Sequence, residues 1–213
     1  MPVDFHSHLS DPYSIVCTDD ATVPSSGLVR CAGLLPGKWT RQRQEKLIRA
    51  LEADSDLQMG EVGLDKRFTD TFPLSEQAEI LSHLLNEAKR LQRSVCLHCV
   101  RATGPMLDIL RSSRLSPFSV LWHGFSGSVE TASELGKLGV IISVGTTFKG
   151  NLKELYKADP ALVPETDYTG EDPKQHSIIL EQRYSYFSQA LGMSANDLEV
   201  HCKDILWRFS TQR

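Results

Sequence analysis

Short apolar segments alternate with amphipathic segments along most of the chain. Several of the apolar segments end at Gly, Pro or Asp, which is typical of strands that are buried on both faces. The pattern predicts eight strands, at residues 3–8, 14–18, 27–35, 57–64, 94–100, 119–125, 139–145 and 162–167.

Amphipathic helices are expected in most of the gaps between these strands. The clearest pattern surrounds Ser75, an expected N-cap, where apolar residues such as Leu81 and Leu85 recur at helical spacing. Ser194 is the expected cap of the last helix. Residues 9–27 are too few and too polar to hold a full crossover helix. The other helices are expected at residues 40–53, 104–113, 129–138, 174–191 and 195–209.

Strands that alternate with helices indicate a mostly parallel sheet. Eight such strands favour an α/β fold of the closed (β/α)8 barrel type, shortened near its start. The 213 residues suffice for one large core, and the sequence contains no internal repeat, low-complexity segment or linker. We therefore expect a single domain over residues 1–213.

Composition and charge narrow the function classes. The net charge is −4 and there is no block of Lys or Arg, which argues against charge-driven coating of nucleic acid but allows a locally positive pocket. No apolar run is long enough for a membrane helix, and Asp4 interrupts the apolar N-terminal stretch, so we expect neither a membrane protein nor a signal peptide. The odd number of cysteines, five, indicates reduced and mostly buried thiols. A cytoplasmic location is expected.

The first predicted strand carries the sequence DFHSH, with His6 and His8 one residue apart. Side chains alternate across a strand, so both imidazoles point the same way and could bind one divalent cation. Taken alone, the pattern fits two polar residues on a solvated face equally well.

Four later strands each carry an acid or a histidine among apolar or small residues near the carboxyl end. A buried ionised carboxylate must be paired or bound to a metal, whereas a single buried histidine is usually a hydrogen-bonded core residue. All four fall at the end of the strands where barrel active sites are built, which favours a shared metal centre. With the first pair, the predicted metal ligands are His6, His8, Glu61, His98, His123 and Asp167.

Imidazoles and carboxylates together suit two divalent cations such as Zn²⁺ or Mn²⁺. Glu61 could bridge two ions that lie about 3.5–4 Å apart. Asp167 could bind one ion and accept a proton from an attacking water. Glu61 and Asp167 are therefore the predicted catalytic residues.

Five blocks of this sequence, in order and roughly in spacing, resemble the signature blocks of the TatD-like metal-dependent hydrolases: DFHSHL, GEVGLDK, LHCVRA, HGFSGS and ETD. The stretch MSANDLEVHCKDILWRF is similar to the closing helix of that family. The resemblance implies a distorted TIM barrel of the amidohydrolase type, a binuclear centre holding Zn²⁺, Mg²⁺ or Mn²⁺, and hydrolysis of phosphodiester bonds in DNA. It places the family's metal ligands on the same six residues.

The chain also departs from the family pattern. Leu35 stands where many members have a histidine in the third-strand region, Val100 stands where many have an arginine, and Lys66 replaces a common aromatic residue. The last two departures resemble a short subgroup of the family. Four residues in loops after strands are candidates for binding substrate phosphate, although each also fits an ordinary loop residue: Lys66, Arg101, Ser126 and Lys149.

Three functions remain open from the sequence. The first is a TatD-like deoxyribonuclease with DNA as its substrate. The second is a binuclear hydrolase of a small amide, ester or phosphoester, and the third is a non-catalytic binding protein that contains metal. No stable protein partner is implied.

The C-x-x-C of Cys96 and Cys99 is expected to be structural, because the two thiols face opposite sides of a strand.

Overall fold

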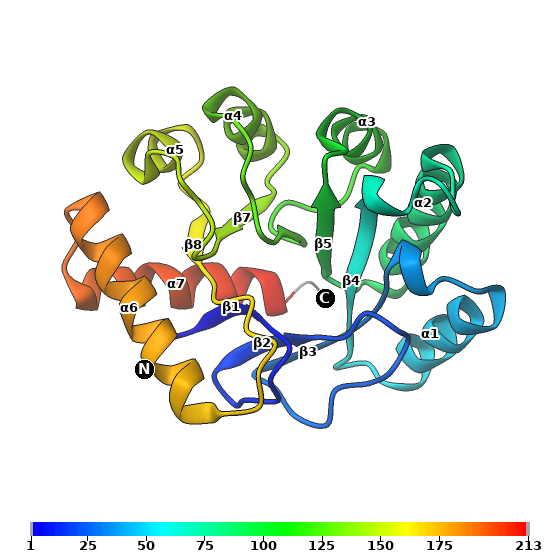
Figure 1. The fold of residues 1–213 in the computed structure, drawn as a ribbon, viewed down its shortest axis with the longest axis horizontal. Helices are drawn as coiled ribbons and strands as arrows, with labels where there is room; N and C mark the ends of the chain where they lie inside the picture. Colours follow the sequence, from blue (N-terminus) through cyan, green and yellow to red (C-terminus); the bar gives the residue numbers. More distant parts are fainter. Residues whose placement is uncertain (1, 212–213) are drawn as a thin grey trace.

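A computed structural model describes residues 2–211 of the chain. Eight parallel strands form one sheet in which each strand pairs with its neighbour in sequence (Figure 1). All eight predicted strands are present, which confirms the α/β barrel. They are β1 (Asp4–Ser7), β2 (Ser14–Cys17), β3 (Val29–Leu34), β4 (Gln58–Asp65), β5 (Val95–Val100), β6 (Val120–Trp122), β7 (Ile141–Val144) and β8 (Leu162–Pro164).

The barrel closes through the segment that follows β8 rather than through β8 itself. Ser7 of β1 forms a parallel bridge with Tyr168. The backbone N–H of Asp167 donates to the carbonyl of His6 at 3.0 Å, and that of His8 donates to the carbonyl of Tyr168 at 2.9 Å. The last strand is therefore shorter than the predicted range 162–167. The residues that follow it join the two edges of the sheet.

Helices surround the barrel and cover most of its circumference (Figure 1). Short 3-10 helices follow β3, as η1 (Pro36–Lys38), and β4, as η2 (Lys66–Phe68). As predicted, the described connections from β1 to β2 and from β2 to β3 contain no helix. The helices are α1 (Arg41–Ala53), α2 (Leu74–Leu91), α3 (Thr103–Ser113), α4 (Val129–Lys137), α5 (Leu152–Ala158), α6 (Pro173–Leu191) and α7 (Ala195–Ser210).

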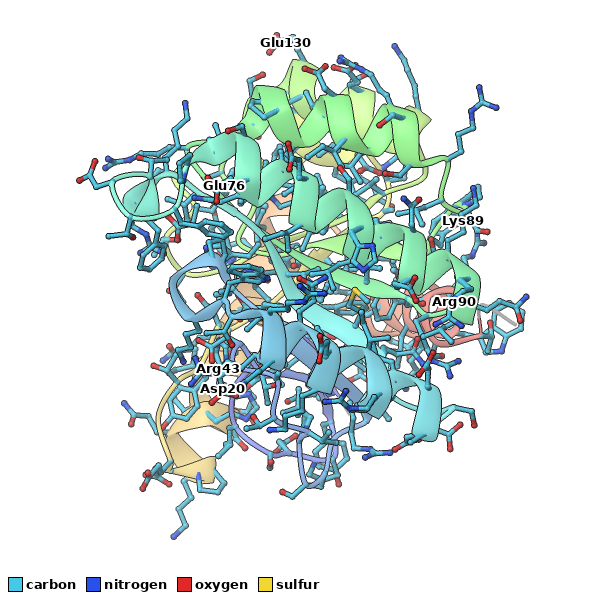
Figure 2. The ribbon with its side chains drawn as sticks, turned by 90° about the vertical axis from the view of Figure 1, so that its right-hand side faces the viewer. Asp20, Arg43, Glu76, Lys89, Arg90 and Glu130 are labelled. Atoms are coloured by element: carbon cyan, nitrogen blue, oxygen red, sulfur yellow. The ribbon has the colours of Figure 1, made fainter. Side chains whose placement is uncertain are left out.

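Local sequence explains where these helices begin and end. Ser194 caps α7 as predicted, by accepting from the N–H of Asp197. The expected cap at Ser75 is wrong, because Pro73 precedes the first turn and Ser75 lies inside α2. Helix α2 has an acid, Glu76, in its first turn and the bases Lys89 and Arg90 in its last, and Figure 2 shows them at opposite ends. This arrangement complements the helix dipole.

Helix α5 is not among the helices expected from the sequence. It has seven residues, its cap is Asn151, and the residues it buries are Leu152 and Leu155. Two apolar positions are too few to establish a helical period, so the apolar pattern alone does not predict this helix.

Helix α7 closes the end of the barrel at which the strands begin. The hydroxyl of Ser94, just before β5, donates to the carbonyl of Phe209. His201 donates from Nε2 to the carbonyl of Leu162, the first residue of β8, at 3.0 Å. In Figure 1 this helix, in red, runs towards the centre of the ring of strands. The opposite end, which carries the carboxyl ends of the strands, remains for a functional site. None of the helices within residues 2–211 combines the length and apolar character needed to cross a membrane.

Candidate metal centre

Glu61 lies in the middle of β4, where the strand is bulged. The pairing of β4 shifts register against both neighbouring strands at this point. Gly60 has φ +152°, and a Cβ on Gly33 would lie 2.0 Å from the amide nitrogen of Glu61, so side chains at these positions would block the close approach of the strands. The expectation that Glu61 lies near a strand end is therefore wrong. Its carboxylate is placed inside the barrel, and the residue is 2% exposed.

The two oxygens of Glu61 face different pairs of histidines. Oε1 lies 3.1 Å from Nε2 of His6 and 3.0 Å from Nε2 of His8. Oε2 lies 3.2 Å from Nδ1 of His98 and 3.1 Å from Nε2 of His123. One carboxylate is thus shared between two pairs of imidazoles. His6 and His8 come from β1 and the loop after it, whereas His98 and His123 come from β5 and the loop after β6.

Asp167 joins the first pair. Its Oδ1 lies 3.6 Å from Nε2 of both His6 and His8. Its side chain is 50% exposed, so the expectation of a buried acid is wrong for this residue. The reason is that β8 ends at Pro164 and Asp167 lies in the following loop, with φ +51°.

The donor set fits divalent cations in chemistry and in spacing. Tetrahedral coordination by nitrogen and oxygen at about 2.0–2.1 Å places neighbouring donors about 3.3 Å apart. The distances between facing donors run from 3.0 Å, for His8 and Glu61, to 3.6 Å, for His8 and Asp167. His6 forms candidate metal-binding groups both with His8 and Asp167 and with Glu61 and His123.

Electrostatics inside the barrel follow from this clustering. Burial would raise the pKa of Glu61, but the imidazoles of His123 and His6 hold it well below its usual range. Burial opposes the charge on His8 and His123, yet the nearby carboxylates outweigh it. Asp167 and Glu61 raise the pKa of His8 to about 10, and Glu61 raises that of His123 to about 9. Burial and the neighbouring His123 lower the pKa of His6.

Three of the four histidines are oriented through their second ring nitrogen. His8 donates from Nδ1 to the carbonyl of Cys17 at 3.1 Å. His98 places Nε2 3.1 Å from Oδ2 of Asp65, and Arg67 holds that carboxylate through Nε at 3.0 Å. Partners of this kind fix the ring and its tautomer in metal sites. For His6, the second nitrogen faces the thiol of Cys96 at 3.4 Å.

The second nitrogen of His123 lies near another buried acid, Glu165. Among the described residues, Nδ1 of His123 has no hydrogen-bond partner and lies 3.9 Å from Oε1 of Glu165. Glu165 accepts from the N–H of Gly124 at 2.9 Å and from the hydroxyl of Ser143 at 2.5 Å. Burial raises the pKa of Glu165 to about 7.

Sequence reasoning overlooked both supporting acids, Asp65 and Glu165. Each was available as a signal, because Asp65 belongs to the GEVGLDK block and Glu165 to the ETD block. Neither follows a spacing rule of its own, since an acid that orients a ligand needs only to be near it in space.

The four candidates for binding phosphate are exposed and follow β4, β5, β6 and β7 respectively, so they lie at the same end of the barrel as the histidines. Within residues 2–211, no hydrogen bond or ion pair joins their side chains to the six candidate metal ligands. The structure therefore places Lys66, Arg101, Ser126 and Lys149 around the mouth of the barrel rather than within the cluster.

Comparisons with known proteins identify a matching family, related sequences and a related structure. A model of the family described as TatD related DNase matches residues 16–209. Human deoxyribonuclease TATDN3 is 30% identical over 177 residues, which cover 75% of this chain and 62% of that protein. The human 3'-5' RNA nuclease TATDN2 is 27% identical over 124 residues, 58% of this chain and 16% of that protein.

The metal-dependent hydrolase YjjV of Escherichia coli is 34% identical over 125 residues, 56% of this chain and 48% of that protein. A crystal structure of YjjV matches with a TM-score of 0.78 at 22% identity, over 97% of this chain and 96% of that one, and so shows the same fold. The matched region spans about half or less of the length of several of the curated relatives.

Proposed function

Since the chain belongs to the TatD related DNase family, we propose that it is a metal-dependent hydrolase of phosphodiester bonds with DNA as its substrate. The observation that carries the proposal is the division of the Glu61 carboxylate between two sets of donors, each within 3.0–3.2 Å. Such a set supports two divalent cations, of which Zn²⁺, Mn²⁺ and Mg²⁺ are the candidates. The proposed ligands are His6, His8, Glu61, His98, His123 and Asp167.

Two bound cations would supply an acidified water and would neutralise charge on the phosphate. The chain's own residues would divide the remaining tasks. Glu61 would hold the two halves of the centre together. Glu165 is buried, at 1% exposure, with Oε1 3.9 Å from Nδ1 of His123, so its charge would act on that ligand rather than on substrate. Asp167 is the acid of this cluster that solvent can reach.

Asp167 is suited to accept a proton from an attacking water. Burial would raise its pKa, but the neighbouring His8, followed by His6, lowers it, so the carboxylate is ionised at neutral pH. Its backbone N–H donates to the carbonyl of His6 at 3.0 Å, which fixes the acid beside the first pair of histidines. An ionised, positioned and partly exposed carboxylate meets the geometric demands on a general base.

Binding of the phosphate backbone would fall to the exposed residues around the mouth. Lys66 and Lys149 offer ammonium groups and Arg101 a guanidinium, which recognise phosphate through charge-assisted hydrogen bonds. Ser126 offers a hydroxyl in the loop that leads to the N-terminus of α4. All four are exposed, so they could contact a substrate without rearrangement of the core.

A second candidate function, hydrolysis of a small amide, ester or phosphoester, is favoured by one observation. Leu35 follows β3 with a partly buried side chain, where many members of the family carry a polar histidine. An apolar residue at this edge of the mouth would suit a small substrate better than a polyanion.

The test is cleavage of DNA by the purified chain in the presence of Mg²⁺, Mn²⁺ or Zn²⁺. We expect cleavage that EDTA abolishes. The loss of activity in His98→Ala and in Asp167→Ala should exceed the roughly 10–100-fold loss that is typical when a residue that only hydrogen-bonds to a metal ligand is removed. His83→Ala is the matched control, because His83 is exposed on α2.

Other outcomes separate the alternatives. Turnover of chromogenic esters, amides or phosphoesters without cleavage of DNA would favour the small-molecule hydrolase. Bound metal without turnover of any of these substrates, or of RNA, would favour the binding protein. Cleavage of DNA that survives EDTA would contradict a metal-dependent mechanism.

A further inference from the structure

Two buried cysteines, Cys17 and Cys96, lie next to His6, and a third, Cys31, lies beside Cys17 on the neighbouring strand. Cys17 ends β2 and pairs in register with Cys31 of β3, and Cys96 lies on β5. Their exposed fractions are 1%, 0% and 0%. The Sγ atom of Cys96 lies 3.4 Å from Nδ1 of His6, the ring nitrogen that does not face Glu61. The thiols therefore adjoin the candidate metal centre at the imidazole of His6, while the carbonyl of Cys17 accepts from Nδ1 of His8.

The donors of this cluster are close enough to converge on one ion. Ligand atoms of His6, Cys17 and Cys96 all lie within 4.8 Å of one another. An ion bound tetrahedrally at about 2.3 Å from sulfur and 2.0–2.1 Å from nitrogen places its donors roughly 3.4–3.8 Å apart. The distances between these ligand atoms would therefore need to shorten by about 1 Å or less for the three residues to bind one ion. Cys31 pairs in register with Cys17 on the neighbouring strand but is not among the residues whose ligand atoms converge here.

We propose that Cys17, Cys96 and Nδ1 of His6 form an inner site for one thiophilic divalent cation, such as Cd²⁺ or Zn²⁺. Sulfur donors select soft ions, whereas the nitrogen and oxygen donors around Glu61 also accept harder ones. Binding releases thiol protons to solvent and involves no change of oxidation state. The inner site is thus distinguished from the centre around Glu61 by its donor chemistry.

Because both sites use the imidazole of His6, a cation in the inner site affects the centre around Glu61, called the outer centre below. This step rests on the proposed function. A neutral imidazole has one nitrogen that carries a proton and one that can bind a metal. An ion held at Nδ1 of His6 leaves the proton on Nε2, which then faces Glu61 as a donor and no longer as a ligand. A thiophilic cation therefore competes with the outer centre for His6 and inhibits hydrolysis.

The direct test is titration of the full chain, freed of metal and reduced, with Cd²⁺ alone. We expect an ultraviolet charge-transfer band from thiolate to metal whose final intensity corresponds to one thiolate-bound Cd²⁺ per chain. The band should be lost in the double variant Cys17→Ser/Cys96→Ser and kept in Cys99→Ser and Cys202→Ser, the matched controls. It should also remain in His98→Ala, which disrupts the outer centre alone.

A second measurement tests the inner site even if Cd²⁺ enters the folded core slowly or the variants fold poorly. The unaltered chain is refolded with ¹¹³Cd²⁺ and its cadmium resonance is recorded. A resonance in the sulfur-ligated range supports the inner site. A spectrum with resonances solely in the nitrogen and oxygen range, or a thiolate band that survives Cys17→Ser/Cys96→Ser, overturns it.

These readouts separate the two proposals because neither uses catalysis. A chain that cleaves DNA but shows no sulfur-bound cadmium loses the inner site and keeps the proposed function. A chain that shows sulfur-bound cadmium but cleaves nothing keeps the inner site and loses the proposed function.

Discussion

Buried acids carry most of the chemistry of this barrel at the scale of single residues. Glu61 is surrounded by four imidazoles and is held ionised by them. Asp65 and Glu165 lie behind two of those imidazoles. Each of these acids faces a cation or a hydrogen-bond donor, as a buried carboxylate must.

Asp159 differs from these acids, because one of its oxygens lacks a partner among the described residues. It is 1% exposed, Oδ1 accepts from the N–H of Ala161 at 2.9 Å, and Oδ2 has no hydrogen bond. Burial raises the pKa of Asp159 to about 6. Because the folded pKa lies above the unfolded one, this residue's contribution to stability declines as the pH rises through about 6.

Asp159→Asn should therefore raise the free energy of unfolding at about pH 8 by roughly 1–3 kcal/mol, with a smaller gain near pH 4. Urea unfolding at the two pH values measures this, with Asp70→Asn, at an exposed position, as the control. An equal effect at both pH values, or a loss of stability at pH 8, would contradict this account of Asp159.

The six candidate ligands could be named from the sequence, since acids and histidines stood out against apolar strands and matched the family blocks in order. How deeply each residue is buried could not be predicted from the sequence. Glu61 lies in mid-strand because of a bulge, and Asp167 is half exposed because β8 ends early. Bulges and strand ends depend on the neighbouring strands, which the local sequence does not describe.

At the scale of elements, a buried ion pair ties the last part of the barrel to the first strand. Nε2 of His176, on α6, lies 2.7 Å from Oδ2 of Asp4, on β1. The N–H of Thr166, which precedes Asp167, donates to Oδ1 of the same Asp4 at 2.9 Å. The pair thereby fixes β1, which carries His6, against the loop that carries Asp167.

Replacing His176 by Gln should make part of the stability independent of pH. Burial would lower the pKa of His176, but the hydrogen bond to Asp4 outweighs it and raises the pKa above 6.5. The contribution of the charged pair is complete below about pH 6.5 and is lost as the pH rises through the raised pKa. His176→Gln should therefore cost about 2 kcal/mol near pH 6 and less near pH 9.

Chemical denaturation at both pH values measures this difference, and His83→Gln on the exposed face of α2 is the control. A cost that is the same at pH 6 and pH 9 would show that His176 contributes packing and not charge.

The pattern of apolar segments was sufficient to predict all eight strands, because strands buried on both faces leave short, nearly continuous apolar runs. It failed for α5, a helix of seven residues, and for the end of β8. The contact of His176 with Asp4 was beyond reach, since the two residues are 172 positions apart and no local pattern links them.

At the scale of the whole molecule, the two ends of the barrel have different roles. Helix α7 covers the end where the strands begin, through Phe209 and His201. The four histidines, Glu61 and Asp167 gather towards the other end, where the exposed loop residues also lie. Alternating strands and helices predicted this polarity, because barrel active sites are built at the carboxyl ends of strands. That residues 1–213 form one domain stays a prediction.

The central claim is that Glu61 joins two cation sites, and the most direct measurement is the binding stoichiometry of Mn²⁺. Mn²⁺ prefers oxygen and nitrogen donors to thiols, so it reports on the centre around Glu61 and not on the cysteines. Calorimetric titration should give two Mn²⁺ per chain, with both sites weakened in Glu61→Gln and unchanged in Glu76→Gln, at an exposed position on α2. One or no Mn²⁺ per chain, or full binding in Glu61→Gln, would contradict the claim.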